Sequence, residues 1–324
     1  MLGLSLNIIL TRKCCPCGCN YCNVFKHEIN NFFEDNFKYN EYSDNIIKDI
    51  IFFTKKNNID SIRFFWGEVF LKKDILKNFV YKLREFWFKK NIYVNTNLHL
   101  FEKKDINWII ENNIQLITSL NWKQYIHTKT RGISWKDFKK LIENINYIIS
   151  HKIKLQINMV LFPYDNDMID NLNYVLWFKS YKINLLPLMY SSLLKDDIIW
   201  SFIKKLDNLG SFIHRNKLQS YFLNFDLLYA DKKEVLPLLD EDYILDSDGW
   251  LYYGMLILET FFNNYKDLLR ICNCKNINSI DFDKNNYKIL VKKIFIKLYE
   301  TNISIYNSIK VSNKFTDILL KYKK

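Results

Sequence analysis

Short apolar runs and longer amphipathic stretches alternate along the first two thirds of this chain, and this alternation most constrains its fold. The apolar runs are rich in β-branched and aromatic residues and have the length of strands. Six strands are expected: Leu4–Leu10, Ser61–Phe65, Ile92–Asn95, Leu116–Leu120, Leu155–Phe162 and Ile183–Met189. The stretches between and after them favour helices: Ser43–Asn57, Lys72–Lys89, Lys104–Asn112, Trp135–His151, Asp167–Phe178 and Asp196–Lys217. Because strand–helix units in series build parallel sheets with right-handed crossovers, the sequence predicts an α/β fold, as an open sheet or a barrel-like wrap.

The pattern changes after residue 217. The segment "DYILDSDGWLYYG" is typical of a β-hairpin that turns at Asp248–Gly249. Helices are expected near Tyr287–Glu300 and Lys314–Lys324. We therefore divide the chain into a barrel-like part, residues 1–217, and a small α+β C-terminal extension, residues 218–324.

Composition and charge argue against several classes of protein. The 324 residues contain no uninterrupted apolar run of about 18 residues, so no membrane span is expected. The net charge of +12 rests on 47 basic residues, of which six are arginine, and no dense basic stripe indicates a nucleic-acid surface. The seven cysteines are clustered, unlike those of a secreted disulfide framework, and indicate reduced thiols in a cytoplasmic protein.

Five of the seven cysteines fall within nine residues of the stretch "TRKCCPCGCNYCNV". The pairs Cys14–Cys17 and Cys19–Cys22 have zinc-knuckle spacing, but the single residue between them is too short for two knuckles to close a tetrahedron. Cys15, Cys19 and Cys22 form a C-x3-C-x2-C pattern, which favours a four-iron four-sulfur (4Fe–4S) cluster with one iron left open. A register that uses Cys14 and Cys17 remains an alternative.

The cysteine stretch resembles the signature of the radical S-adenosylmethionine (SAM) superfamily, and later strand ends resemble its other motifs. In "SIRFFWGEVFL", Gly67 and Glu68 match the Gly-Gly-Glu motif that meets the SAM amino group, while Trp66 replaces the first glycine. In "VNTNLHLF", Thr96 and Asn97 match the family's T-N-G stretch, in which Leu98 replaces the glycine.

A fourth motif indicates the subgroup that includes peptide-modifying members of SPASM or twitch type. "ITSLNWKQYIHTKTRG" resembles its S-L-D-G…H…R-G run. The matching residues are Ser119, His127, Arg131 and Gly132, and Asn121 and Trp122 depart from the pattern. Each motif follows a predicted strand, and the carboxyl ends of barrel strands share one face, so the motifs are expected to meet there.

The resemblance implies a partial (β/α)6 TIM-like barrel, a 4Fe–4S cluster and SAM. The implied metal ligands are Cys15, Cys19 and Cys22, and the implied cofactor-binding residues are Gly67, Glu68, Thr96, Asn97, Ser119, Arg131 and Asn158. Arg131 would grip the SAM carboxylate, while Asn158 is equally suited to a core position. The implied reaction is reductive cleavage of SAM to a 5′-deoxyadenosyl radical that removes hydrogen from a substrate. The implied electron donor is a flavodoxin or ferredoxin, and no catalytic acid or base is expected.

The C-terminal third resembles a degenerate form of the extension that carries auxiliary clusters in that subgroup. Asp248 and Gly249 are kept, but Gly254 and Met255 stand where Pro-Cys is usual. Cys272 and Cys274 are too few to hold a second cluster, so none is expected.

The substrate remains open at this stage. It is expected to be a peptide or protein side chain, with a nucleoside or other small molecule as the alternative. A non-catalytic iron–sulfur or zinc protein is the third interpretation. Because no leader-binding domain precedes Cys15, peptide recognition would fall to the C-terminal third or to a separate protein.

Overall fold

The computed structural model describes residues 4–11, 19, 43–121, 124–188, 196–225, 242–246, 249–253, 268–274, 277, 283–301 and 303–323. Within them the strands form one sheet in the order β6-β5-β4-β3-β2-β1-β7-β8-β9. The first six strands in the chain are β1 (Leu4–Ile8), β2 (Ile59–Phe64), β3 (Asn91–Asn95), β4 (Ile114–Ser119), β5 (Leu155–Leu161) and β6 (Lys182–Pro187). All neighbouring pairs among these six are parallel. The six predicted strands are therefore confirmed, with ends shifted by one or two residues.

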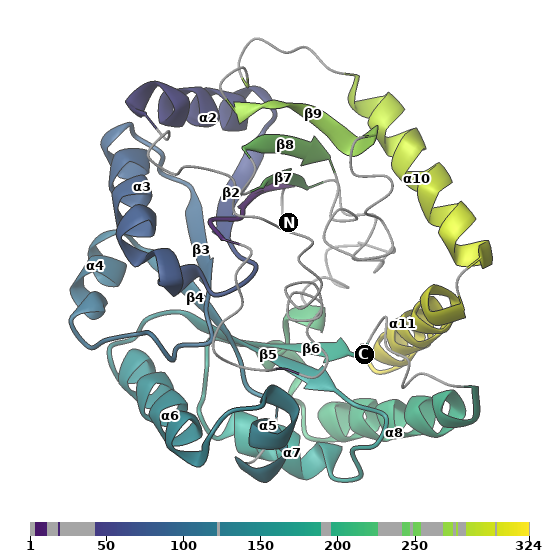
Figure 1. The fold of residues 1–324 in the computed structure, drawn as a ribbon. Helices are drawn as coiled ribbons and strands as arrows, with labels where there is room; N and C mark the ends of the chain where they lie inside the picture. The colour runs from purple at the N-terminus through teal and green to yellow at the C-terminus, as the bar shows by residue number, and fades with distance from the viewer. Residues whose placement is uncertain are drawn as a thin grey trace.

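The helices cover the outer side of the curved sheet (Figure 1). Those that were predicted are α2 (Asp44–Lys56), α3 (Lys73–Glu85), α4 (Asp105–Glu111), α6 (Trp135–Ser150), α7 (Met168–Leu176) and α8 (Asp196–Arg215). Helix α6 begins with a capping box in which Ser134 and Asp137 satisfy each other's backbone N–H groups. Helix α5 (Gln124–Arg131) was not predicted.

The hydrophobic core lies between the outer face of the sheet and these helices. Along β2, Ile62 and Phe64 are fully buried and alternate with Ser61 and Arg63, which point to the inner face. The register with β1 places Leu6 beside Ile62 on the same outer face. Burying apolar side chains of this size stabilises the fold by about 1.5–3 kcal/mol each.

The first strand of the C-terminal hairpin joins the barrel sheet. β7 (Tyr243–Leu245) pairs antiparallel with β8 (Trp250–Tyr253), which confirms the hairpin, and β8 pairs with β9 (Arg270–Asn273). β7 also pairs in parallel with β1. Asp242 reinforces this contact, because its carboxylate accepts the Ser5 N–H at 2.8 Å and the Asn7 side-chain amide at 3.1 Å. The sheet thus runs through both predicted domains, and a boundary at residue 217 stays a prediction.

The opposite edge of the sheet, at β6, contacts the segment that follows α8. Phe222 forms a bridge with Ile183 beside β6. The Asn224 side chain accepts the Leu185 N–H at 2.8 Å and donates to the Leu185 carbonyl at 3.0 Å. Pro187 has no N–H to offer at the end of this edge. These contacts cover part of the β6 edge within the described residues.

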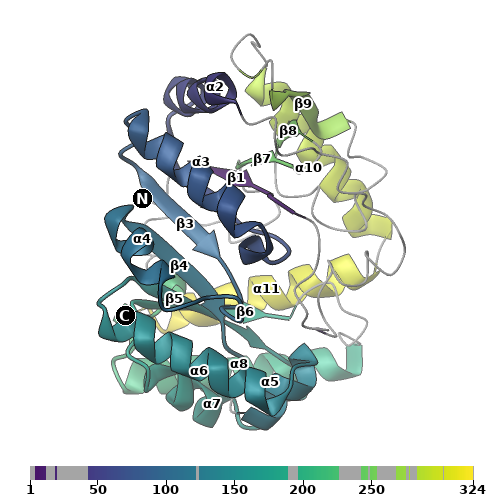
Figure 2. The same cartoon turned by 60° about the vertical axis from the view of Figure 1, so that its left-hand side comes forward.

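The predicted C-terminal helices correspond to α10 (Lys284–Thr301) and α11 (Ile303–Lys321), and both start earlier than expected. Helix α11 lies beside α8 and next to β6 (Figures 1 and 2). The backbones of α8 and α11 come close at Gly210, where an added Cβ would lie 2.8 Å from Ile318 and 2.8 Å from Tyr322. None of the helices within the described residues is long and apolar enough to cross a membrane.

Candidate functional site

Glu68 joins the carboxyl ends of β2 and β3. Its side chain is 1% exposed. One carboxylate oxygen accepts the Phe70 N–H at 3.0 Å and the Thr96 hydroxyl at 2.7 Å, and the other accepts the Asn97 N–H at 2.8 Å. Two of the sequence motifs are therefore in direct contact. Whether Glu68 also meets the amino group of SAM stays a prediction.

The turn that follows β3 is held at two further points by the buried Asn144 and the partly buried Lys73. The Asn144 side-chain amide on α6 donates to the Leu98 carbonyl at 2.8 Å. Lys73 of α3 donates to the Leu100 carbonyl at 2.8 Å. Lys73 is itself fixed by the fully buried Asp105 at 2.8 Å. Two neighbouring helices and the end of β2 thus hold this turn in one conformation.

The positions where the family's glycines are replaced keep a left-handed backbone. Trp66 has φ of 70° and Leu98 has φ of 63°. Gly67, between Trp66 and Glu68, has φ of 55°. A left-handed conformation costs a residue with a Cβ roughly 1–2 kcal/mol. Both replacements therefore sit at backbone positions that a glycine would adopt without this penalty.

The segment after β4 forms a buried polar cluster of Asn121, His127 and Arg131. The Asn121 N–H donates to His127 Nδ1 at 3.2 Å, and Arg131 donates to Asn121 Oδ1 at 3.4 Å. The Asn121 amide oxygen also accepts the Val160 N–H at 3.4 Å. Asn121 thus links α5 to β5, a role that an Asp at this position could also fill.

His127 is neutral in this cluster. The ring is fully buried and lies against Phe138, with 5.3 Å between ring centroids. Burial lowers the pKa of His127 well below its ordinary value, and the positive charge of Arg131 and then His99 lower it further. Because Nδ1 accepts a hydrogen bond, Nε2 carries the proton, and this buried atom has no hydrogen-bond partner among the described residues.

Ser119 and Asn158 lie side by side on neighbouring strands. They are paired in the register of β4 and β5. Both are partly exposed, and the Asn158 amide oxygen accepts the Gln156 side-chain amide at 2.8 Å. A partly exposed amide and hydroxyl on one strand edge suit a ligand with hydrogen-bonding groups, which fits SAM.

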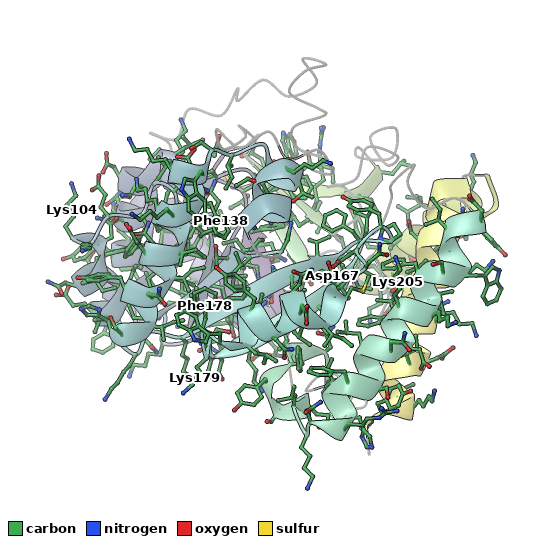
Figure 3. The ribbon with its side chains drawn as sticks, turned by 90° about the horizontal axis from the view of Figure 1, so that it is seen from below. Lys104, Phe138, Asp167, Phe178, Lys179 and Lys205 are labelled. Atoms are coloured by element: carbon green, nitrogen blue, oxygen red, sulfur yellow. The ribbon has the colours of Figure 1, made fainter. Side chains whose placement is uncertain are left out.

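The loop after β5, on the same edge of the sheet, is held from α8. Figure 3 shows Lys205 reaching this loop beside Asp167. Lys205 donates to the Pro163 carbonyl at 2.7 Å and to Asn166 Oδ1 at 2.8 Å. Asp165 in this loop is buried and accepts the Asp167 N–H at 2.8 Å. No signal in the sequence indicated these contacts.

The cysteine cluster is described only at Cys19, which is buried. The predicted ligands Cys15 and Cys22 lie outside the described residues, as do the alternatives Cys14 and Cys17. No group of three metal-ligating side chains is found in the part of the chain that the structure describes. The assignment of the cluster ligands therefore rests on the sequence. Three thiolates suit a 4Fe–4S cluster with one open iron.

Cys272 and Cys274 are both buried near β9. Burial and the neighbouring Cys274 raise the pKa of Cys272 to about 11. Without a metal, this setting favours the thiol over the thiolate. That the C-terminal extension holds no auxiliary cluster stays a prediction.

Comparison with known proteins finds solved structures of similar fold. Native anSMEcpe with bound AdoMet superposes with a TM-score of 0.70 at 16% identity, covering 99% of this chain and 98% of that one. Native anSMEcpe with bound AdoMet and Cp18Cys peptide gives 0.69 at 16% identity, over 99% and 97%. Coproporphyrinogen III oxidase (HemN) from Escherichia coli, a radical SAM enzyme, gives 0.50 at 11% identity, over 98% and 90%. No curated protein matches the sequence.

These similarities define the class of fold, an α/β partial barrel with a parallel sheet, as predicted. A family model for the radical SAM superfamily matches residues 9–172, about half of the chain. The protein belongs to the radical SAM superfamily.

Proposed function

We propose that this protein is a radical SAM enzyme that cleaves SAM reductively and removes a hydrogen atom from its substrate. The observation that carries the proposal is the buried contact between two motifs, in which Glu68 binds Thr96 and Asn97 at the carboxyl edge of the sheet. When bound, a 4Fe–4S cluster on Cys15, Cys19 and Cys22 supplies the electron and the coordination site for cleavage of the S–C5′ bond.

The protein's own residues bind and orient SAM. Glu68 keeps the Thr96–Asn97 turn in place, so the partly exposed Asn97 side chain can face the ligand. Asn121 accepts a hydrogen bond from the Arg131 guanidinium and so helps to orient it, and Arg131 is proposed to bind the SAM carboxylate. Ser119, Asn158 and the backbone at Gly67 complete the proposed contact set. No acid or base is required, because the chain's role is to orient reactants and exclude water.

The proposed substrate is a peptide or protein side chain. Support comes from the similar fold of anSMEcpe, which has been solved with a bound peptide. A nucleoside or another small molecule is the second candidate, and the weaker similarity to the oxidase HemN favours it. The proposed reductant is a flavodoxin or ferredoxin in the cytoplasm. The C-terminal extension is proposed to lack an auxiliary cluster, because its two cysteines, Cys272 and Cys274, are too few to hold one.

Anaerobic reconstitution with iron and sulfide tests the proposal. We expect the wild-type protein to hold about four irons and to convert SAM to 5′-deoxyadenosine with dithionite. The variant Cys19→Ala should lose most of the iron and all cleavage. The matched control Cys272→Ala removes a buried thiol outside the motif and should keep both.

Two outcomes would contradict the proposal. Equal iron content and SAM cleavage in Cys19→Ala would show that the ligand assignment is wrong. A colourless wild-type protein that holds a single zinc would leave only a binding role.

A further inference from the structure

The inner face of the sheet is polar and carries no acidic side chain from β2 to β6. The residues of these described strands that point inward alternate with the buried outer residues. They are Ser61, Arg63, Asn91, Tyr93, Asn95, Gln115, Ile117, Ser119, Gln156, Asn158, Val160, Lys182, Asn184 and Leu186. No acidic side chain on the inner face of these strands therefore neutralises the cations among them.

Arg63 is the inward-facing cation closest in sequence to the candidate site. It lies on β2, next to Tyr93 in the register, and its guanidinium lies 5.6 Å from the centroid of the Tyr93 ring. Trp66 and Glu68 follow three and five residues later. Two residues of strand span roughly 7 Å, so Arg63 lies one inward-facing layer below the proposed SAM site.

The guanidinium of Arg63 lacks a polar partner among the residues that the structure describes. Its buried Nε atom has no hydrogen-bond acceptor there, and no ion pair joins Arg63 to another described residue. Arg63 is half-buried, and its terminal nitrogens are not among the enclosed atoms without a partner. A half-buried cation that finds no acceptor among the described residues is suited to an anion brought by a ligand.

The other inward-facing cation, Lys182 on β6, has a polar partner. It donates to the Ser220 carbonyl at 2.7 Å. Near Arg63, Asn95 also has an enclosed side-chain oxygen without a partner. Arg63 and Asn95 together can receive a group that carries both a carboxylate and a hydrogen-bond donor, and a guanidinium is shaped for a two-point contact with a carboxylate.

We propose that Arg63 binds a carboxylate of the substrate, so that the substrate is an acid rather than a neutral or cationic molecule. This rests on the proposed function, because it assumes that the substrate lies on the inner face, below SAM. The carboxylate belongs either to an acidic side chain within a peptide or to the free end of a peptide or a small acid.

Three probes of matched size separate these sources. N-acetylglutamate N-methylamide carries a side-chain carboxylate, N-acetylglutamine carries a terminal carboxylate, and N-acetylglutamine N-methylamide is neutral. Binding is measured by calorimetry or saturation-transfer NMR on the reconstituted protein loaded with SAM. We expect one of the acids to bind at least about tenfold more tightly than the neutral probe, as is usual for a charge-assisted hydrogen bond.

The variant Arg63→Gln should abolish this preference, and Arg63→Lys should retain part of it. The control Lys182→Gln removes an inward-facing cation of the same sheet and should leave the preference intact. Iron content and SAM affinity should be unchanged in all three variants, which also shows that they fold.

Equal binding of all three probes to the wild-type protein would overturn the proposal. An equal loss of preference in Lys182→Gln would also overturn it. The preference for the acid would then arise from the summed positive charge of the inner face rather than from a contact with Arg63. A tenfold loss of SAM affinity in Arg63→Gln would assign Arg63 to SAM instead. A wild-type protein that holds no cluster and cleaves no SAM would be a failure of the proposed function, and the iron and cleavage assays detect it separately.

Discussion

The side-chain amide of Asn144 donates a hydrogen bond of 2.8 Å to the carbonyl oxygen of Leu98, a core residue held in a left-handed conformation. Both side chains are buried, and 46 residues separate them in the sequence. Helix α6 thus supports the turn in which the family normally has a glycine. The left-handed path is imposed by tertiary contacts rather than by the residue type.

Removing this hydrogen bond should loosen the turn. Asn144→Leu leaves the Leu98 carbonyl buried without a donor, which costs about 1–3 kcal/mol in the free energy of unfolding. We expect weaker SAM binding at temperatures well below the unfolding midpoint. Denaturant unfolding and SAM titration measure the two effects. The exposed Asn173→Leu on α7 serves as the control, and an unaltered SAM affinity in Asn144→Leu would contradict the positioning role.

Backbone strain at Trp66 can be isolated by comparing two truncations. Both Trp66→Ala and Trp66→Gly remove the indole, but only glycine adopts φ of 70° without a Cβ penalty. The glycine variant should therefore be more stable than the alanine variant by about 1 kcal/mol. At the preceding residue, Phe65, whose φ is not left-handed, the order should reverse. Urea unfolding of the four variants gives the comparison, and the same order at both positions would exclude strain at Trp66.

The buried ion pairs of Asp105 should make stability depend on acid pH. Burial raises the pKa of Asp105, but the hydrogen bonds from Lys73 and Lys77 outweigh it and lower the pKa below its ordinary value. A group with a lowered folded-state pKa stabilises the fold fully above its unfolded value of about 3.9 and loses that contribution as the pH falls further.

The variant Asp105→Asn measures this contribution. At neutral pH it should destabilise the protein by about 3–5 kcal/mol, because two partly buried lysines lose their counter-ion. The difference from wild type should shrink below about pH 4. Unfolding curves from pH 3 to pH 7 test the sign, and a constant difference across that range would mean that Asp105 acts through packing alone.

Close approach of α8 and α11 can be tested at Gly210. In an exposed helix interior, Gly→Ala stabilises by about 1 kcal/mol. Here the new Cβ would lie 2.8 Å from Ile318 and Tyr322, so Gly210→Ala should destabilise by about 1–3 kcal/mol instead. Ser201→Ala, on the exposed side of α8, is the control. A Gly210→Ala protein that is more stable than wild type would show that α11 can move away from α8 and avoid the predicted clash.

The sequence alone determined the strands and most helices of the barrel, because their signals are local. An alternating strand such as Leu155–Leu161 carries its own pattern, and so does the Ser134 capping box. Helix α5 was not predicted, because "QYIHTKTR" has few apolar residues that would indicate a buried face. The position of each motif at the end of a strand could also be predicted, because the strands and crossovers follow one another in the order of the sequence.

Tertiary structure alone decided the contacts between distant segments. Nothing local indicates that Tyr243 pairs with Leu6, because the energy of that pairing arises only when the chain closes a loop of more than two hundred residues. The same holds for Asn144 at Leu98 and for Arg63, whose Nε has no acceptor among the described residues. Residue types specify which chemistry is available, but only the packed fold decides which polar groups are satisfied by the protein and which are left for a ligand.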